Sequence, residues 1–214
     1  MHKAISCFIP FGNETSVRRT LSSIREACPE AHIYLMSVSS AEKEFDGCPI
    51  IQIKDSYNSL DAFEKIVLYS ETEQVLLYTK HTPLELGYKA IERMKAHLID
   101  YRCGMVYADY YEWKDGELKS HPLIDYQLGS VRDDFDFGSV RMFHTKLLKL
   151  GVQYLKDAVR SNKEKIAFKH SALYAIRLFI SRMSTIQHIK EYLYTEVEED
   201  LRLSGEKQFD YVNP

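Results

Sequence analysis

The stretch AISCFIPFGNE, residues 4–14, predicts a buried β-strand that ends in a proline and a Gly-Asn break. Its first seven residues are almost all apolar, as expected of a strand that is covered on both faces of a sheet. After the break, apolar residues recur at helical spacing, and Asn13 or Thr15 is available as the N-cap. The sequence therefore predicts a strand followed by a helix that runs to about Ala27.

The same alternation of short apolar runs and amphipathic stretches continues through the first half of the chain. Further strands are predicted at residues 32–38, 49–54 and 74–78, with a helix that begins at Ser59 before the last of them. The residues TPLE, 82–85, form a capping box with proline at the first helical position, so we expect a helix to start there. This order predicts an α/β fold with a mixed central sheet flanked by helices.

The second half of the chain begins with a predicted β-hairpin. Residues 105–113 and 118–122 flank the turn KDGE, in which Asp-Gly supplies the positive φ that a tight hairpin needs. The elements predicted after it are helices at residues 147–160 and 166–181 and a strand at residues 186–197.

Length and composition set the outer limits. A chain of 214 residues with 45% hydrophobic and 28% charged residues can bury one sizeable core, so we expect residues 1–204 to form a single domain. Residues 205–214 are polar and unpatterned and predict a flexible C-terminal tail; the alternative is a junction within a longer protein. A net charge of -3 and a pI near 6.2 give no electrostatic reason to expect a nucleic-acid partner.

Cysteine usage and hydropathy indicate the compartment. The four cysteines lie far apart and form no C-x-x-C pair, so they predict reduced core thiols and signal neither a zinc site nor a disulfide framework. The N-terminus lacks a signal-peptide pattern, and no apolar run approaches membrane-spanning length. We therefore expect a cytoplasmic protein without a membrane span, and the oligomeric state is left open.

In an open α/β sheet, ligands bind outside the carboxyl ends of the strands. The first candidates for a binding site are therefore the residues that follow the predicted strands, at 10–14, 37–40, 55–59 and 79–82. No G-x-G-x-x-G follows the first strand, and no G-x-x-x-x-G-K-[ST] occurs in the chain. These absences exclude the fingerprint-bearing dehydrogenases and the P-loop enzymes.

Several segments resemble family 2 glycosyltransferases, which have the GT-A fold. Residues 4–14 and the helix with the letters TLSSI are similar to the opening of these enzymes, an apolar strand, a Pro, an Asn-Glu and a "TLxSI" helix. A second match runs without gaps from Ala62 to Thr79, the part that leads into Asp-x-Asp in such enzymes. Residues 83–94 and 106–111 are similar to the helix after that motif and to the "vygdy" strand.

The resemblance implies a GT-A-like fold and transfer of a sugar from a nucleotide-sugar donor to a hydroxyl acceptor. The acceptor would be a glycan or a cell-surface polysaccharide precursor. By the same resemblance, the donor would be bordered by the following residues: Pro10, Phe11, Asn13, Glu14, Ser37, Asn58, Lys80, His81 and Asp109.

The chain departs from the family at three acidic positions. The Asp that usually holds the nucleotide base would fall near Ser37. The Asp-x-Asp positions fall on Thr79, Lys80 and His81, and the acidic pair that usually supplies the general base falls near His170, before an "LR" helix. All three acidic positions have changed.

The replaced acids decide what chemistry the site can keep. Such enzymes normally offset the charge of the departing diphosphate with Mg²⁺ or Mn²⁺ held by carboxylates, which Thr79, Lys80 and His81 do not provide. The ammonium of Lys80 and a protonated His81, beside the N–H groups of a Thr82-capped helix, would instead bind phosphate directly. We therefore predict no protein-held metal; Mg²⁺ or Mn²⁺ as a cofactor stays open, and the bland alternative is that both residues are solvated.

Three aspartates and one histidine are the candidates for catalysis. Asp133, Asp134 and Asp136 form the densest acidic cluster, and extended spacing would put Asp134 and Asp136 on one face. The phenylalanines between the acids predict an anchored segment, whereas the alternative is a solvated turn. His170 is a candidate general base, although a lone histidine on a helix is more often structural.

Two other functions compete with transfer. A catalytically inactive GT-A-like domain used for binding or scaffolding is favoured by the loss of every expected acidic position. A sugar-phosphate nucleotidyltransferase would need a Gly-rich basic loop after the first strand, which FGNE at residues 11–14 does not supply.

Overall fold

The computed structural model describes residues 4–39, 42–114, 116–127, 135–161 and 168–197. Within these ranges ten strands form one sheet in the order β3-β4-β2-β1-β5-β9-β7-β10-β6, and β8 pairs with β7. The strands are β1 (Ser6–Pro10), β2 (His32–Ser37), β3 (Glu44–Phe45), β4 (Cys48–Gln52), β5 (Gln74–Tyr78), β6 (Leu84–Leu86), β7 (Met105–Lys114), β8 (Glu117–His121), β9 (Val140–His144) and β10 (Ile186–Val197). The helices are α1 (Glu14–Ala27), α2 (Leu60–Tyr69), α3 (Ala90–Asp100), α4 (Thr145–Ser161) and α5 (Ala172–Met183).

The order in which the chain adds strands to the sheet reverses at β1, which makes this the topological switch point of the sheet. Strand β1 is parallel to both β2 and β5, and β2 is parallel to β4. From β1 the chain therefore builds the sheet outward on one side and then returns to place β5 on the other. In such sheets, the loops at the carboxyl ends of the two central strands diverge and leave room for a ligand.

Most strands of the far half of the sheet point the same way as those of the first half. Strand β9 is antiparallel to β5 and to β7, and β7 is parallel to β10, so β5, β7 and β10 share one direction. Their carboxyl ends lie at one end of the sheet together with those of β1, β2 and β4, and β9 starts there. We call this region, from Pro10 and Ser37 to Tyr78 and Glu196, the carboxyl end of the sheet.

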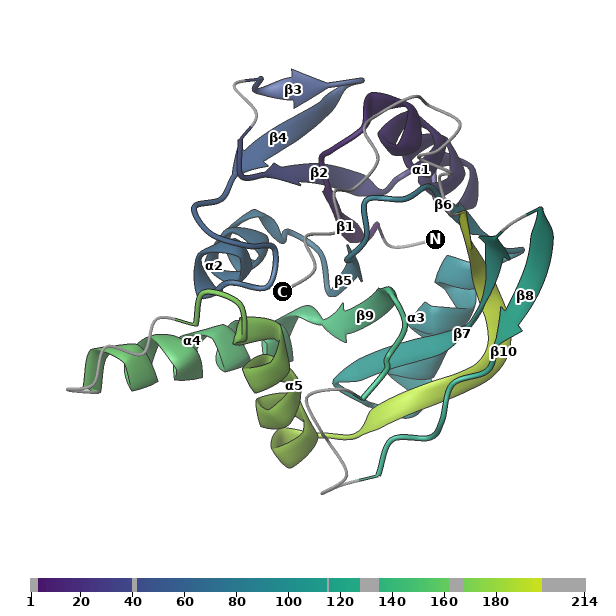
Figure 1. Ribbon diagram of the computed structural model, residues 1–214. Coiled ribbons are helices and arrows are strands. Elements are labelled where there is room, and N and C mark those ends of the chain that lie inside the picture. The colour runs from purple at the N-terminus through teal and green to yellow at the C-terminus, as the bar shows by residue number, and fades with distance from the viewer. Residues whose placement is uncertain (1–3, 40–41, 115, 128–134, 162–167, 198–214) are drawn as a thin grey trace, which may run out of the picture.

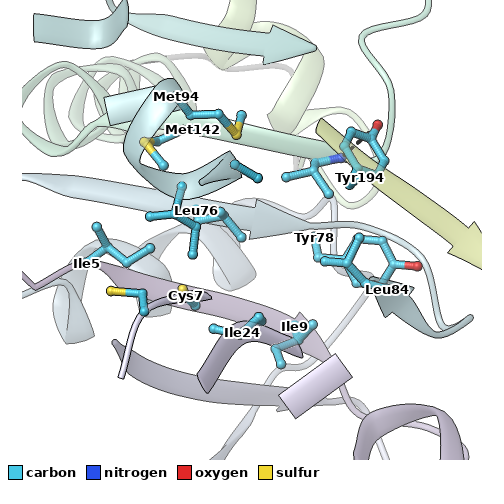
Figure 2. Packing of buried hydrophobic residues seen from close by; sticks show 14 of the residues in the cluster. Ile5, Cys7, Ile9, Ile24, Leu76, Tyr78, Leu84, Met94, Met142 and Tyr194 are labelled. Atoms are coloured by element: carbon cyan, nitrogen blue, oxygen red, sulfur yellow. Dashed lines mark hydrogen bonds between the residues drawn. The ribbon is translucent and has the colours of Figure 1, made fainter. Parts of the chain in front are cut away.

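Helices cover both faces of the sheet (Figure 1). The buried residues of α1 and α3 pack with one face of the sheet in one apolar cluster. Figure 2 shows Ile24 of α1 and Met94 of α3 packed with Leu76 of β5 in that cluster. The second cluster joins α2, α4 and α5 to the opposite face. This three-layer arrangement confirms the α/β fold with a mixed central sheet that the sequence predicts.

Most local predictions are confirmed. Asn13 caps α1, and its side chain accepts hydrogen bonds from the backbone N–H groups of Thr15 and Ser16. Ser59 caps α2, the hairpin of β7 and β8 forms, and the last strand has the predicted bounds, Ile186–Val197. The C-terminal residues for which we predict a tail lie outside the described residues, so that prediction is untested.

The capping box at residues 82–85 is a wrong prediction. Residues Leu84–Leu86 form β6, which pairs antiparallel with β10. Its backbone is held by side chains of α1, because Leu84 N donates to Thr20 Oγ1 at 3.0 Å and Leu86 N donates to Ser23 Oγ at 2.7 Å. These tertiary bonds override the local helix signal, and α3 begins only at Ala90.

Among the described residues, no helix is long and apolar enough to cross a membrane.

The start of β9 is fixed by Tyr194 of β10. The Tyr194 hydroxyl accepts hydrogen bonds from the backbone N–H groups of Ser139, at 3.0 Å, and Val140, at 3.5 Å. The preceding Gly138 has φ +66°, and a Cβ atom there would clash with the Tyr194 hydroxyl. Glycine is therefore required twice at this position, for the left-handed backbone and for the close approach.

We predict that Gly138→Ala destabilises the fold by more than Gly116→Ala. Gly116 has φ +78°, and no described atom lies within 4 Å of the position that a Cβ atom would take. Alanine at 116 therefore costs only the left-handed conformation, about 1 kcal/mol. Alanine at 138 adds the clash with Tyr194, worth about 2 kcal/mol more. Urea unfolding of both variants measures the difference.

The Tyr194→Phe background tests the cause. With the hydroxyl gone, the nearest Tyr194 atom to the added Cβ is Cζ at 3.5 Å, so the Gly138→Ala penalty should shrink towards the Gly116→Ala value. Strictly additive effects of the two substitutions would show that the Tyr194 hydroxyl is not what excludes a side chain at 138.

Candidate functional site

Three loops meet at the carboxyl end of the sheet. The Tyr57 hydroxyl, in the loop after β4, donates to the carbonyl of Phe11, in the loop after β1, at 3.3 Å. The Tyr57 ring meets the ring of His81, in the loop after β5, edge-on with centroids 5.1 Å apart. A Cβ atom on Gly12 would lie 2.7 Å from His81 Nδ1. The residue ranges predicted at 10–14, 55–59 and 79–82 are therefore in contact.

The predicted donor-binding residues of the first loop are already engaged. Pro10 is buried as the last residue of β1, and the Asn13 side chain is used in capping α1. Glu14 is exposed and lies 3.8 Å from Arg18. Phe11 is half-buried and packs against Phe45, with ring centroids 5.2 Å apart. The backbone carbonyl of Phe11, and not its ring, takes part in the contact between the loops.

Ser37 and Asn58 occupy opposite environments. Ser37 is buried at the end of β2, and its hydroxyl accepts a hydrogen bond from Ser39 N at 3.3 Å. Asn58 is exposed, and its carbonyl accepts a hydrogen bond from Ala172 N, the first residue of α5, at 2.9 Å. This hydrogen bond holds the start of α5 against the loop after β4, near the carboxyl end of the sheet.

Lys80 is paired with a carboxylate that no local sequence pattern predicts there. Its Nζ makes an ion pair with Glu196 Oε2, from the end of β10, and the Glu196 side chain is only 3% exposed. A buried carboxylate needs such a counter-ion, because an unpaired one carries a large desolvation cost. The Lys80 ammonium, which we expected to be free, is therefore paired with Glu196. The other carboxylate oxygen, Glu196 Oε1, has no hydrogen-bond partner among the described residues.

The hollow beside Lys80 is closed. It lies between the ends of β1 and β5 and the first turns of α1, and it has no room for a water molecule. The expected helix N-terminus at Thr82 is also missing, since residues 84–86 are a strand. A diphosphate enters this hollow only if the 79–82 loop moves, although the Lys80 side chain itself is 45% exposed.

The surroundings of His81 disfavour its protonated form. Partial burial of its ring lowers its pKa below the ordinary value of 6.5. A protonated His81 in contact with phosphate stays a prediction, because a bound anion would oppose this shift.

The acidic cluster is described in part. Asp133 and Asp134 lie outside the described residues. Asp136 is exposed, and its Oδ1 accepts a hydrogen bond from Gly138 N at 2.7 Å. Phe137 is fully buried, with its ring centroid 4.5 Å from that of Phe135. The prediction of an anchored segment is confirmed for residues 135–137.

Asp109 belongs to an internal network and does not face a ligand space. Its Oδ1 accepts hydrogen bonds from Leu123 N at 2.6 Å and from His188 Nε2 at 2.8 Å. The other nitrogen of His188 lies 2.8 Å from Asp125, and the His188 ring stacks on Tyr107 at 4.8 Å. This network holds the segment after β8 against the sheet, which differs from the nucleotide contact expected of Asp109.

His170 is exposed in the turn before α5. Its neighbours bind the loop after β4: the carbonyl of Phe168 accepts from Leu60 N at 3.0 Å, and that of Lys169 accepts from Ser56 Oγ at 2.7 Å. The turn therefore borders the same loop as Asn58. The exposed position of His170 is compatible with the predicted role and does not test it.

Sequence reasoning missed several residues of this region. Tyr57 lies within a range that we predict to follow a strand, and an aromatic residue at such a strand end could have marked it as a candidate. Glu196 reaches Lys80 across 116 residues of sequence, and only the sheet order reveals it. Two buried arginines, Arg141 and Arg177, also lie near Asp136, and their electrostatic effect on each other is visible only in the fold.

The described residues offer no ready-made site for a divalent metal. In the part of the chain that the structure describes, no group of three or more His, Cys, Asp or Glu side chains could hold a metal ion. Thr79, Lys80 and His81 supply no carboxylate oxygen, the ligand that Mg²⁺ and Mn²⁺ prefer.

Comparison with known proteins identifies the fold. No protein-family model matches the sequence, and no curated protein does. The crystal structure of S. aureus TarS 1-349 in complex with UDP-GlcNAc matches with a TM-score of 0.63 at 12% identity, over 93% of this chain and 59% of that chain. The complex of the same protein with UDP gives 0.60 at 12% identity, over 92% and 61%.

A crystal structure of a longer TarS chain has a similar fold. The crystal structure of S. aureus TarS has a TM-score of 0.62 at 12% identity, over 92% of this chain but 37% of that chain. This chain therefore spans less than two thirds of the structures it resembles. At this identity the likeness shows the fold alone, and it confirms the predicted GT-A-like mixed sheet.

We predict that Lys80→Met destabilises the fold by roughly 2 kcal/mol, between the values for surface and buried ion pairs. The substitution leaves the Glu196 carboxylate buried without its cation. In a Glu196→Gln background the same substitution should cost much less, which a double-mutant cycle by chemical denaturation measures.

Lys190→Met is the matched control. Lys190 also pairs with a carboxylate at 2.8 Å, but both partners are exposed. Its substitution should change the unfolding free energy far less than Lys80→Met. Equal effects of the two substitutions would contradict the burial of charge at Glu196.

We predict that His81 titrates below pH 6.5 in the ligand-free protein. Because folding lowers its pKa, the unfolded chain holds the proton more tightly. The stability that neutral His81 contributes is complete above the ordinary pKa and is lost as the pH falls through 6.5 towards the folded value. NMR titration of the His81 ring, assigned with His81→Gln, measures this; a pKa at or above 6.5 would refute it.

Proposed function

We propose that this chain is a GT-A-like glycosyltransferase domain that binds a nucleotide sugar at the carboxyl end of its sheet. The sugar is transferred to a hydroxyl acceptor, a glycan or a cell-surface polysaccharide precursor. The observation that carries this proposal is that the loops after β1, β4 and β5 meet beside the topological switch point at β1. In TarS, a protein of the same fold, the crystal structures contain UDP-GlcNAc and UDP.

The donor lies across these three loops in the proposed complex. The ring of Tyr57 offers an apolar face for the nucleoside, with Asn58 exposed beside it. The diphosphate points towards the 79–82 loop, which opens to admit it. Because that loop carries no carboxylate, we propose that protein side chains, and not a protein-held metal ion, offset the charge of the leaving diphosphate.

The acceptor lies on the side of Asp136. In a single displacement, a base takes the proton of the acceptor hydroxyl as the hydroxyl oxygen attacks the sugar carbon and the nucleoside diphosphate leaves. Asp136 is exposed and fixed by its bond to Gly138, so its carboxylate suits this role. Asp133 and Asp134 share the segment, and His170 is the second candidate base.

An inactive GT-A-like binding or scaffolding domain is the second candidate function. Two observations favour it: Lys80 is paired with Glu196, and the hollow beside Lys80 has no room for a water molecule. In this alternative, the carboxyl end of the sheet is a closed remnant of a donor site.

A panel of nucleotide sugars separates the two functions. We expect UDP-sugars or other nucleoside diphosphate sugars at about millimolar concentration to raise the melting temperature in EDTA as well as in Mn²⁺. A ligand at 100 times its Kd adds about 2.7 kcal/mol to the stability of the folded state. Release of nucleoside diphosphate, followed by chromatography, reports transfer or slow donor hydrolysis.

Tyr57→Ala and Tyr69→Ala form a matched pair for this panel. Tyr69 is an exposed tyrosine on α2, and it lies outside the meeting point of the loops. Only Tyr57→Ala should weaken donor binding. Binding without any diphosphate release favours the inactive domain, stabilisation that strictly requires Mn²⁺ contradicts the metal-independent proposal, and no binding by any donor overturns the donor site itself.

A further inference from the structure

Two arginines lie buried beside the carboxyl end of the sheet, apart from Lys80 and His81. Arg141 is the second residue of β9 and is 8% exposed, and Arg177 lies in α5 and is 6% exposed. The residues on either side of Arg141, Val140 and Met142, pack in the cluster of α1 and α3, so the Arg141 side chain points to the opposite face, where α5 lies. Both guanidinium groups are therefore on the α5 side of the sheet.

The segment before β9 contacts both arginines. Arg141 donates a hydrogen bond to the carbonyl of Gly138, and the Arg177 guanidinium lies 4.7 Å from the centre of the Phe137 ring. Asp136 acts electrostatically on both side chains. Residues 136–138 therefore contact the arginine pair, and they also belong to the segment that holds the candidate catalytic aspartates.

The described carboxylates compensate the two positive charges only in part. Burial lowers the pKa of Arg141, and burial together with the charge of Arg141 lowers the pKa of Arg177 to about 10. Asp136, the nearby carboxylate, is exposed and already bonded to Gly138 N, while Glu196 is paired with Lys80. Two buried cations side by side call for an anion that can reach both.

Unpartnered hydrogen-bond donors collect at the same place. The Nε atoms of Arg141 and Arg177 are buried and have no hydrogen-bond partner within the described ranges. In the same part of the chain, the hydroxyl of Tyr126, whose ring packs against Phe137 at 6.0 Å, and the hydroxyl of Ser139 are also buried without a partner. Buried polar groups are nearly always satisfied, so a set of donors of this kind points to an acceptor-rich ligand.

We infer that Arg141 and Arg177 form an anion-binding subsite that takes the diphosphate of the donor. The inference rests on the proposed function and replaces Lys80 and His81 as the groups that carry the phosphate charge. Guanidinium groups bind phosphate oxygens in pairs and keep their charge when buried. The diphosphate approaches from the side of the exposed Asp136, and its oxygens accept from the orphaned Nε atoms.

The subsite also explains how transfer proceeds without carboxylates at residues 79–81. When the bond between the sugar carbon and the diphosphate oxygen breaks, both electrons stay with the diphosphate, which leaves with one more negative charge. The paired guanidinium groups stand where this charge develops and offset it through fixed hydrogen bonds. Asp136, displaced from the arginines by the diphosphate, is released to accept the proton of the acceptor hydroxyl.

Calorimetric titration with inorganic pyrophosphate, UDP and uridine tests the subsite. We expect Arg141→Met and Arg177→Met to weaken pyrophosphate and UDP binding roughly tenfold or more, and to leave uridine binding unchanged. Arg182→Met is the matched control, because Arg182 is an exposed residue of the same helix and its loss removes the same charge. Arg177→Lys keeps a charge at the site and should bind with intermediate affinity.

Folding is checked separately. Methionine fills a similar volume without a charge, so both methionine variants should keep the circular dichroism of the parent and unfold at a higher temperature without ligand. If a methionine variant does not fold, the comparison of Arg177→Lys and Arg141→Lys with the parent decides.

The outcomes distinguish this inference from the proposed function. UDP binding that is as tight in Arg177→Met as in the parent overturns the subsite while leaving the donor site intact. Pyrophosphate binding that Arg177→Met abolishes, in a protein that binds no nucleotide or nucleotide sugar, supports the anion subsite and removes the donor. Failure of the parent to bind pyrophosphate, UDP and every nucleotide sugar of the panel overturns both.

Discussion

The hydroxyl of Tyr194 holds the carboxyl end of the sheet together. By accepting the N–H groups of Ser139 and Val140, it fixes where β9 begins, and Gly138 makes room for it. The register of β9 on β5 and β7 follows from this start. So does the side of the sheet to which Arg141 points, and with it the position of the arginine pair relative to Asp136.

The charges at this end are arranged in a pattern opposite to that of a metal-dependent transferase. Basic side chains occupy the interior: Arg141 and Arg177 are buried, and Lys80 neutralises the buried Glu196. In the proposed complex these side chains would attract an anion directly, where a cluster of carboxylates would first need a cation. The fold is shared with TarS, and the electrostatics belong to this chain.

The sequence predicted the parts of the fold that depend on local signals. Asn13 and Ser59 cap the helices they were expected to cap, and the strand ending at Pro10 and the last strand are where periodicity put them. The helix at residue 82 failed because the side chains of Thr20 and Ser23 hold that backbone in a strand. For the site, sequence located the three loops but not the pairing of Lys80 with Glu196 or the arginine pair, since partners far apart in sequence leave no local pattern.

The place of β10 has a consequence for the synthesis of the protein. This strand is the last described element, yet it lies between β7 and β6 and supplies both the anchor for β9 and the counter-ion for Lys80. A nascent chain still lacking it has two unpaired strand edges and an unfinished binding end. The carboxyl end of the sheet can therefore assemble only after nearly all of the described polypeptide has left the ribosome, and until then the exposed edges of β6 and β7 are sites for mispairing with other chains.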